Sequence, residues 1–382
     1  EAWALDLRSA LGGQSDVALT SSPERPAATA NCFCRSKWTI NRPWRFITWP
    51  VSKPPIPIII GPRKRAQSPT TISRKPIPTP TMPDNSLSLD DLVQPFQVDT
   101  LGVNGRVVRL GPVLEQLVAP HDYPAPVADL LAQTVALAAT LASVLKFDGV
   151  FTLQVQGDGP VGLVMADITT AGGMRCYARY DADRLAQADI SGAHGAPVPA
   201  LLGSGYLAFT VDQGPDTDRY QGITELTGAT LADCAHAYFR QSEQLETSFK
   251  IEVHRGESAD DWWVGGLFLQ KMPVSASGDA ATPEEAEKVS EDWNRSTILM
   301  ASATENELVD ISLSAHDLIW RLFHDEEPRV FEQTGLQFKC RCSREKIEGA
   351  LVTYPLDELL SMREDDTGEV GVSCQFCNTR YG

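Results

Sequence analysis

The residues best suited to chemistry are four cysteines near the end of the sequence, which form the pairs Cys340-x-Cys342 and Cys374-x-x-Cys377. Four thiolates at two short spacings can complete a tetrahedral Zn²⁺ shell without water, which is the structural type of zinc site. The alternative is four unrelated thiols, and two close pairs in one short tail argue against it. An ordinary zinc ribbon uses CxxC twice, with a shorter separation than the thirty-one residues found here.

The residues around the first pair also bear on metal binding. Arg341, Arg344 and Lys346 lie beside it, and positive charge favours the thiolate form on which metal binding depends. The insert between the pairs, SREKIEGALVTYPLDELLSMREDDTGEV, predicts two short helices and an acidic turn.

The other four cysteines give weaker signals. Cys176 and Cys234 lie in apolar stretches, where a free cysteine is usually a small buried residue. A nucleophilic pairing of one of them with His236 or His254 has no local signature to support it. Cys32-x-Cys34 is a lone pair in unpatterned sequence, a weak metal signal. Eight cysteines in 382 residues are too few for a disulfide scaffold, and their clustering is typical of a reducing compartment.

Charge divides the chain into two parts. Residues 1–81 carry twelve Lys and Arg against four Asp and Glu, whereas residues 82–382 carry 21 against 46, a net charge of −25. Such an acidic body repels a phosphate backbone, so we expect no nucleic-acid partner. No uninterrupted apolar run is long enough for a membrane helix, so we expect no membrane partner either.

Residues 1–81 differ from the rest in pattern as well. They begin with Glu1, hold twelve of the 26 prolines, and show no helical or strand period before the first methionine, Met82. Three interpretations compete. The first is a non-native extension, with Met82 as the true start and the segment disordered. The second is an organelle-targeting peptide, because the segment is basic and poor in acids. The third, least favoured, is a functional tail.

The body from Met82 predicts an α+β fold built mainly on antiparallel sheet. The stretch from Pro126 to Leu145 is apolar on nearly all faces, which predicts a buried central helix. Alternating residues around Gly157–Pro160 predict a β-hairpin. Ser88 to Asp91 resembles a capping box, and the glycine pairs in TTAGGM and VGGLFLQ are interpreted as turns or close backbone approaches. Further predicted strands are GRVVRLG, MRCYARY, GYLAFTVDQ, RYQGITEL and SFKIEVHR.

Helix signals dominate after the predicted strands. Capping boxes begin at Thr230, Thr282 and Thr304, and a similar pattern begins at Ser314. We therefore predict a core domain over residues 82–275, several short charged helices in a linker over 276–337, and a small zinc domain over 338–382.

Taken together, these residues resemble one family. FKCRCSREKIEGAL followed by CQFCNTRY looks like the zinc end of the 33 kDa chaperonins, the redox-regulated heat-shock chaperones. The likeness covers nearly all of Met82 to Gly382 and leaves residues 1–81 without a counterpart. Blocks in family order are HDYPAPVADLLAQ, LKFDGVFTLQVQGDGPV, RYQGITEL, YFRQSEQLET, GGLFLQKMP and WRLFHDEEPRVFE.

The resemblance implies an ATP-independent holdase that binds unfolding client proteins and is not an enzyme. In such proteins the reduced form holds one Zn²⁺ on the four thiolates and is inactive. Oxidation forms disulfides between neighbouring cysteines, here Cys340–Cys342 and Cys374–Cys377, and releases the metal. The adjoining linker then unfolds, and the active form can dimerise. The implied location is the cytoplasm, or an organelle if residues 1–81 are a transit peptide.

Two other classes remain open from the residues alone. A zinc ribbon that binds nucleic acid conflicts with the acidic body and with the lack of a basic, aromatic stripe. A thiol–disulfide oxidoreductase could use the CxxC pair, but the surrounding sequence does not resemble a thioredoxin βαβ unit.

Overall fold

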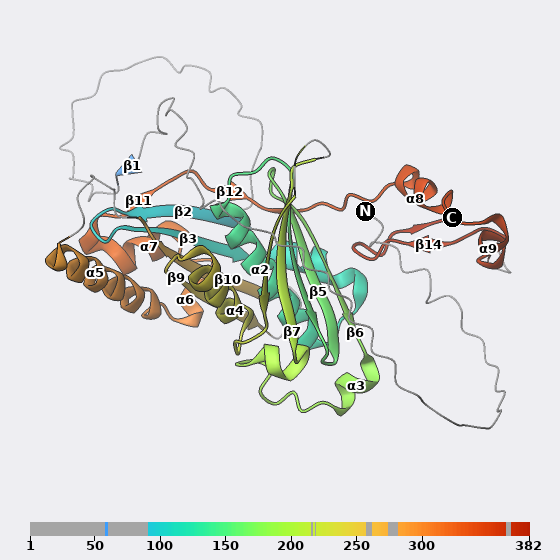
Figure 1. Cartoon of the computed structure of the whole chain (residues 1–382), viewed down its shortest axis with the longest axis horizontal. Helices are drawn as coiled ribbons and strands as arrows, with labels where there is room; N and C mark the ends of the chain where they lie inside the picture. The colour runs from blue at the N-terminus through green and yellow to red at the C-terminus, as the bar shows by residue number, and fades with distance from the viewer. Residues whose placement is uncertain are drawn as a thin grey trace, which may run out of the picture. The chain divides into compact units, whose positions relative to one another are not determined.

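The structure is a computed structural model in which two β-sheets and a long helix between them form the main body (Figure 1). The described residues belong to one compact unit. They are 58–59, 91–214, 217, 219–256, 262–273, 282–363 and 368–382. The α+β class predicted from the sequence is confirmed. Met82, Cys32 and Cys34 lie outside the described residues.

The first sheet has seven strands, and all of its described pairings are antiparallel. Its order is β1-β11-β2-β3-β10-β9, with β12 also paired to β2. The strands are β1 (Ile58–Ile59), β2 (Leu92–Val98), β3 (Val103–Leu110), β9 (Thr247–Arg255), β10 (Trp262–Lys271), β11 (Arg329–Val330) and β12 (Thr334–Gly335).

The second sheet has six strands in the order β13-β6-β5-β4-β7-β8, antiparallel except that β13 runs parallel to β6. In β4, Phe151, Leu153 and Val155 are buried and the residues between them are not, so one face meets the core and the other meets solvent. The strands are β4 (Val150–Gly157), β5 (Val161–Thr169), β6 (Gly173–Tyr180), β7 (Gly205–Asp212), β8 (Tyr220–Glu225) and β13 (Gln337–Phe338).

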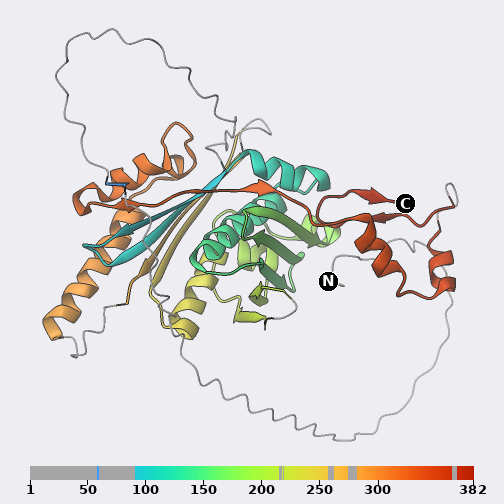
Figure 2. The same cartoon turned by 90° about the horizontal axis from the view of Figure 1, so that it is seen from above.

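Helix α2 (Ala125–Val144) lies between the sheets and contacts strands of both (Figure 2). Its length and composition would allow it to cross a membrane. Most of it is buried inside the protein, however, as the sequence predicts for a central helix. Other helices of the body are α1 (Pro112–Val118), η3 (Ala119–His121), α3 (Ala182–Gln187), η4 (Val198–Leu202), α4 (Leu231–Tyr238) and η5 (Phe239–Glu243).

The linker helices pack on the first sheet and form a second hydrophobic cluster with it. They are α5 (Pro283–Ala301), α6 (Glu305–Val309), α7 (Ala315–Phe323) and η6 (His324–Glu326). The buried guanidinium of Arg109 on β3 donates to the backbone carbonyls of Glu307, Leu308 and Leu313. A Cβ at Gly265 of β10 would lie 2.5 Å from the Leu308 oxygen, so α6 lies directly against the strand.

The C-terminal module begins after β13 and contains α8 (Arg344–Leu351), α9 (Leu356–Ser361), β14 (Val372–Ser373) and β15 (Arg380–Tyr381). The two helices confirm the prediction for the insert, whereas residues 364–367 of its acidic turn lie outside the described residues.

Two sequence interpretations need correction. The capping box expected at Ser88 to Asp91 is not followed by a helix, because strand β2 begins at Leu92. Ser88 lies outside the described residues, and the Asp91 carboxylate accepts hydrogen bonds from the amides of Gly111 and Val113 at the start of α1. Helix α5 has nineteen residues and is not short. The glycine pair of VGGLFLQ lies inside β10, and Gly265 confirms the second of the two alternatives, a close backbone approach.

The predicted hairpin and the other predicted strands are present as β3, β4, β5, β6, β7, β8 and β9. The capping boxes at Thr230, Thr282 and Thr304 are also present. Strand β1, in contrast, lies within residues 1–81, where the sequence shows no strand period. The domain boundaries remain a prediction.

Candidate metal centre

The two cysteine pairs are carried by two backbone segments of the C-terminal module. The first pair follows β13, and Ser343 caps α8 directly after it by accepting from the amide of Lys346. The second pair lies in a tight turn between β14 and β15, where the amide of Asn378 donates to the carbonyl of Cys374 at 2.8 Å. Asn378 has a φ of 54°, the left-handed conformation that asparagine tolerates and that closes the turn.

The four cysteine sulfurs form one compact cluster. All of their Sγ atoms lie within 4.8 Å of one another. The Sγ atoms of Cys340 and Cys374 are 3.7 Å apart, and those of Cys342 and Cys377 are 3.4 Å apart. A tetrahedral Zn²⁺ with bonds of about 2.3 Å to sulfur requires sulfurs about 3.8 Å apart. The arrangement therefore fits a four-coordinate metal ion with a complete shell of thiolates.

The pKa values of three of the four thiols are shifted, and not all in the same direction. Hydrogen bonding, above all from Cys374, lowers the pKa of Cys340 to about 4. The same hydrogen bond raises the pKa of Cys374, its donor, and burial raises the pKa of Cys342. One sulfur is thus ready to act as a thiolate, while others must lose protons when a metal binds, so metal affinity falls as pH falls.

Two polar residues next to the sulfurs are not evident from the cysteine pattern. The hydroxyl of Tyr381 lies 3.2 Å from Cys342 Sγ, and Cys377 Sγ donates to the hydroxyl of Thr379 at 3.2 Å. Neighbours of this kind orient metal ligands. Their positions two and four residues after Cys377 are the available sequence signal, because the β14–β15 turn brings them back to the cluster.

The basic residues beside the first pair donate hydrogen bonds to groups other than the sulfurs. Arg341 pairs with Asp167 of β5, and Lys346 donates to the backbone carbonyl of Arg341. Arg344 donates to the carbonyl of Gly382. Their hydrogen bonds hold the module together and against the sheet instead of reaching the sulfurs.

The two remaining described cysteines are structural, as predicted. Cys176 and Cys234 are buried in the main core cluster. Burial raises the pKa of both thiols, which makes them poor nucleophiles. His236 lies near the hydroxyl of Thr247, with 3.4 Å between Nδ1 and Oγ1.

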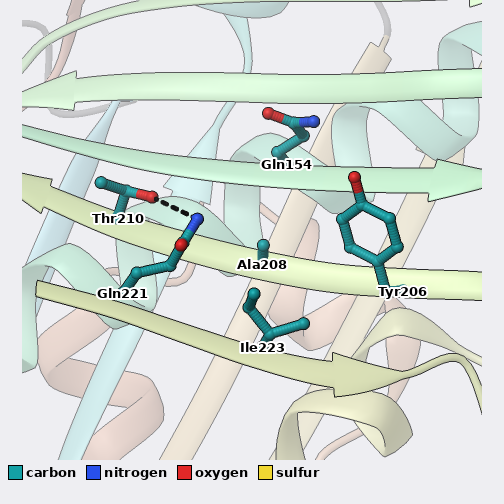
Figure 3. A pocket seen from close by; sticks show the side chains of 6 residues that line it. All are labelled: Gln154, Tyr206, Ala208, Thr210, Gln221 and Ile223. Carbon is teal, nitrogen blue, oxygen red and sulfur yellow. Dashed lines mark hydrogen bonds between the residues drawn. The ribbon is translucent and has the colours of Figure 1, made fainter. Parts of the chain in front are cut away.

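A hollow on the outer face of the six-stranded sheet is a second candidate site (Figure 3). Its volume is about 300 Å³, and the side chains of Gln221 and Thr210 hydrogen-bond across its floor at 3.4 Å. None of its lining residues is a cysteine, histidine or carboxylate, so the cysteine cluster is the better site for chemistry. The lining residues are Gln154, Tyr206, Ala208, Thr210, Gln221 and Ile223.

Comparisons with known proteins agree with this arrangement. The model of the family described as Hsp33 protein matches residues 91–382. The 33 kDa chaperonin of Caulobacter vibrioides (strain NA1000 / CB15N) is 40% identical over 305 residues, covering 79% of this chain and 97% of the relative. That of Ectopseudomonas mendocina is 37% identical over 294 residues, covering 77% and 92%.

The fold also matches a solved structure. The crystal structure of the 33 kDa chaperonin of Thermotoga maritima superposes with a TM-score of 0.63 at 23% identity, covering 76% of this chain and 93% of that one. At that identity the structural match shows similarity of fold only. The family model and the sequence relatives show that the chain is related to these proteins. The chain belongs to the Hsp33 family, the 33 kDa heat-shock chaperonins.

Proposed function

We propose that this protein is a redox-regulated, ATP-independent holdase whose reduced, Zn²⁺-bound form is inactive. The observation that carries the proposal is the cluster of four thiols, all within 4.8 Å, in a module with very little core of its own. Bound Zn²⁺ would supply folding free energy to that module, on the order of 10 kcal/mol in peptide models. The ligands would be Cys340, Cys342, Cys374 and Cys377, with one ion per chain.

The proposed switch is a two-electron oxidation of each cysteine pair. Two thiols and one molecule of peroxide give one disulfide and two molecules of water, and each disulfide removes two of the four ligands. From the family resemblance we propose the bridges Cys340–Cys342 and Cys374–Cys377. The sulfur distances of 3.7 and 3.4 Å join cysteines of different pairs, so the bridges must be mapped by mass spectrometry of the oxidised protein.

The linker would then provide the surface that binds clients. Helix α5 is the most weakly held part, because only Ser296 and Met300 are buried along its nineteen residues. Elements with few buried contacts open first. Trp293 and Trp320 lie on α5 and α7 and would report that opening as a red shift in fluorescence. Helices α6 and α7 bury a larger share of their residues against the first sheet than α5 does, so their release would follow that of α5.

The partners follow from the same proposal. Clients are unfolding proteins that expose apolar segments, and the oxidised form can associate as a homodimer. The acidic body is unsuited to nucleic acid, and we propose no membrane partner and a cytoplasmic location.

The experiment is suppression of client aggregation at mild heat, before and after peroxide, with metal release followed in the same sample. We expect weak suppression when reduced, strong suppression when oxidised, and reversal by reductant plus zinc. Equal suppression in both states would rule out the switch. Turnover in insulin reduction would point to an oxidoreductase, and a salt-dependent shift of labelled DNA or RNA would point to a nucleic-acid module.

A further inference from the structure

The cysteine module makes a specific contact with the outer face of the six-stranded sheet. Arg341, which lies between two of the cysteines, donates from Nη2 to Oδ2 of Asp167 on β5 at 2.6 Å. Asp167 is only 3% exposed, although it lies on the outer face. The same carboxylate accepts from Arg175 of β6 at 2.8 Å and from the hydroxyl of Thr152 on β4 at 2.6 Å. One buried carboxylate therefore joins three strands of the sheet to the module.

The second cysteine pair makes its own contact with the same face. Phe376, between Cys374 and Cys377, is buried, and its ring lies against the guanidinium of Arg175, with 3.8 Å from the ring centre to the guanidinium carbon. Its ring centre is also 6.3 Å from that of Tyr177 on β6. A cation over an aromatic face and two neighbouring rings are both favourable contacts.

The backbone on either side of the cysteines continues this docking. The amide of Lys339, directly before Cys340, donates to the carbonyl of Met174 on β6 at 2.9 Å, and the amide of Gln337 donates to Gly172 at 3.0 Å. The side chain of Asn378, directly after Cys377, donates to the carbonyl of Pro120 at 2.9 Å. Each of these contacts therefore comes from a residue within three positions of a cysteine.

We propose that Asp167 is the docking point of a latch that holds the cysteine module on the outer face of the six-stranded sheet, and that the latch depends on the geometry of the four sulfurs. A disulfide within Cys340-x-Cys342 closes a tight ring around Arg341 and changes its backbone, so the guanidinium leaves Asp167. The latch rests on the proposed function for its trigger, but its existence in the reduced protein can be tested separately.

The latch can be opened without unfolding the core. When Arg341 is removed, Asp167 keeps Arg175 and Thr152, so no buried carboxylate is left unpaired. The Arg341 side chain is 33% exposed, so water screens its half of the pair and the effect is moderate. The opposite change, Asp167→Asn, also weakens Arg175 and is the harsher variant.

The test compares Arg341→Gln with Arg344→Gln in the reduced, zinc-loaded full chain. Arg344 is the matched control because it is an arginine of the same module whose hydrogen bond goes to Gly382. Hydrogen exchange at the amides of Gln337 and Lys339 reports docking directly. We expect Arg341→Gln to exchange there roughly three- to tenfold faster than wild type, as for the loss of one partly screened charged hydrogen bond, with zinc still at one equivalent.

The outcomes separate the latch from the proposed function. Unchanged exchange in Arg341→Gln, or equal acceleration in both variants, would overturn the latch. Loss of zinc from Arg341→Gln would overturn it too, because Arg341 would then act on the metal site. In the double variant with Asp167→Asn, exchange no faster than in Asp167→Asn alone would support a direct pair, whereas additive effects would contradict it. If exchange responds as expected but no state suppresses aggregation, the latch stands and the proposed function fails.

Discussion

The sheets around α2 and the cysteine module are held together in different ways. The first region buries an almost continuous set of apolar side chains from both sheets and α2. Among its described residues, the module buries Ile347, Val372, Cys374 and Phe376, and Phe376 packs on the core sheet. A buried side chain of this size contributes about 1.5–3 kcal/mol. Ordering each residue costs about 1.5 kcal/mol, so these few cannot keep the module folded.

The difference explains why the proposed metal would stabilise the module and not the body. A fold that depends on four thiolates is lost when the thiols are oxidised, whereas a fold that depends on apolar burial is insensitive to oxidant. The linker helices lie between these extremes, since they have their own cluster with the first sheet but expose most of α5.

Replacing all four clustered cysteines with serine should give the largest effect. We expect zinc to fall from one equivalent to near zero and the module to unfold, because about 10 kcal/mol of metal-dependent folding free energy is removed. Metal analysis and hydrogen exchange over residues 338–382 measure both. The control, Cys176→Ala with Cys234→Ala, should keep the metal; retained zinc in the serine variant would contradict the site.

Substitution of Arg109 should weaken the packing of the linker helices on the first sheet. Arg109→Ala leaves the carbonyls of Glu307, Leu308 and Leu313 without their buried donor, which should cost about 2–4 kcal/mol. We expect faster exchange in α6 and α7 and some suppression of aggregation without oxidant. Arg109→Lys keeps the charge but cannot span three acceptors, so it should be intermediate. If Arg109→Ala changed neither the exchange of α6 and α7 nor the suppression of aggregation, contacts other than those of Arg109 would hold the linker on the first sheet.

The body itself should lose stability in alkali. Burial raises the pKa of Cys176 and of Tyr238 in the folded protein. The unfolded chain therefore releases these protons first, and stability falls as pH rises above about 9. Each group contributes up to about 1.4 kcal/mol per pH unit above its unfolded pKa. Urea unfolding midpoints measured between pH 8 and 10.5 test this. The double variant Cys176→Ala with Tyr238→Phe should lose less stability over that pH range than the unchanged protein.

Removing residues 1–81 should have the smallest effect. We expect the free energy of unfolding of the chain from Met82 to lie within about 0.5 kcal/mol of that of the full chain. We also expect both to bind one equivalent of zinc. The pairing of β1 with β11 is the described contact that this deletion removes. A clear loss of stability would show that β1 belongs to the fold and that the segment is not an extension.

Local signals in the sequence predicted much of this arrangement. The alternation of β4 and the capping boxes at Thr230, Thr282 and Thr304 depend on neighbours along the chain, and they are present as expected. The four cysteines were found by spacing alone.

The errors and omissions arise from contacts between distant residues. Asp91 resembled the last residue of a capping box, but its carboxylate accepts from the amide of Gly111, twenty residues later, at the start of α1. For the Gly pair of β10 the sequence left a turn and a close backbone approach open, because the contact that decides between them, α6 at Leu308, lies elsewhere in the chain. The pairing of Arg341 with Asp167 spans 174 positions and leaves no local pattern.

Hydrogen exchange of the full chain, before and after zinc is removed by peroxide, tests the central claim most directly. We predict that residues 338–382 lose protection completely, that α5 exchanges faster, and that α2 and strands β4 to β7 are unchanged. Reduction with zinc should restore the original pattern. If the module kept its protection without the metal, or if α2 lost protection together with it, the account of a metal-dependent module on an independent core would be wrong.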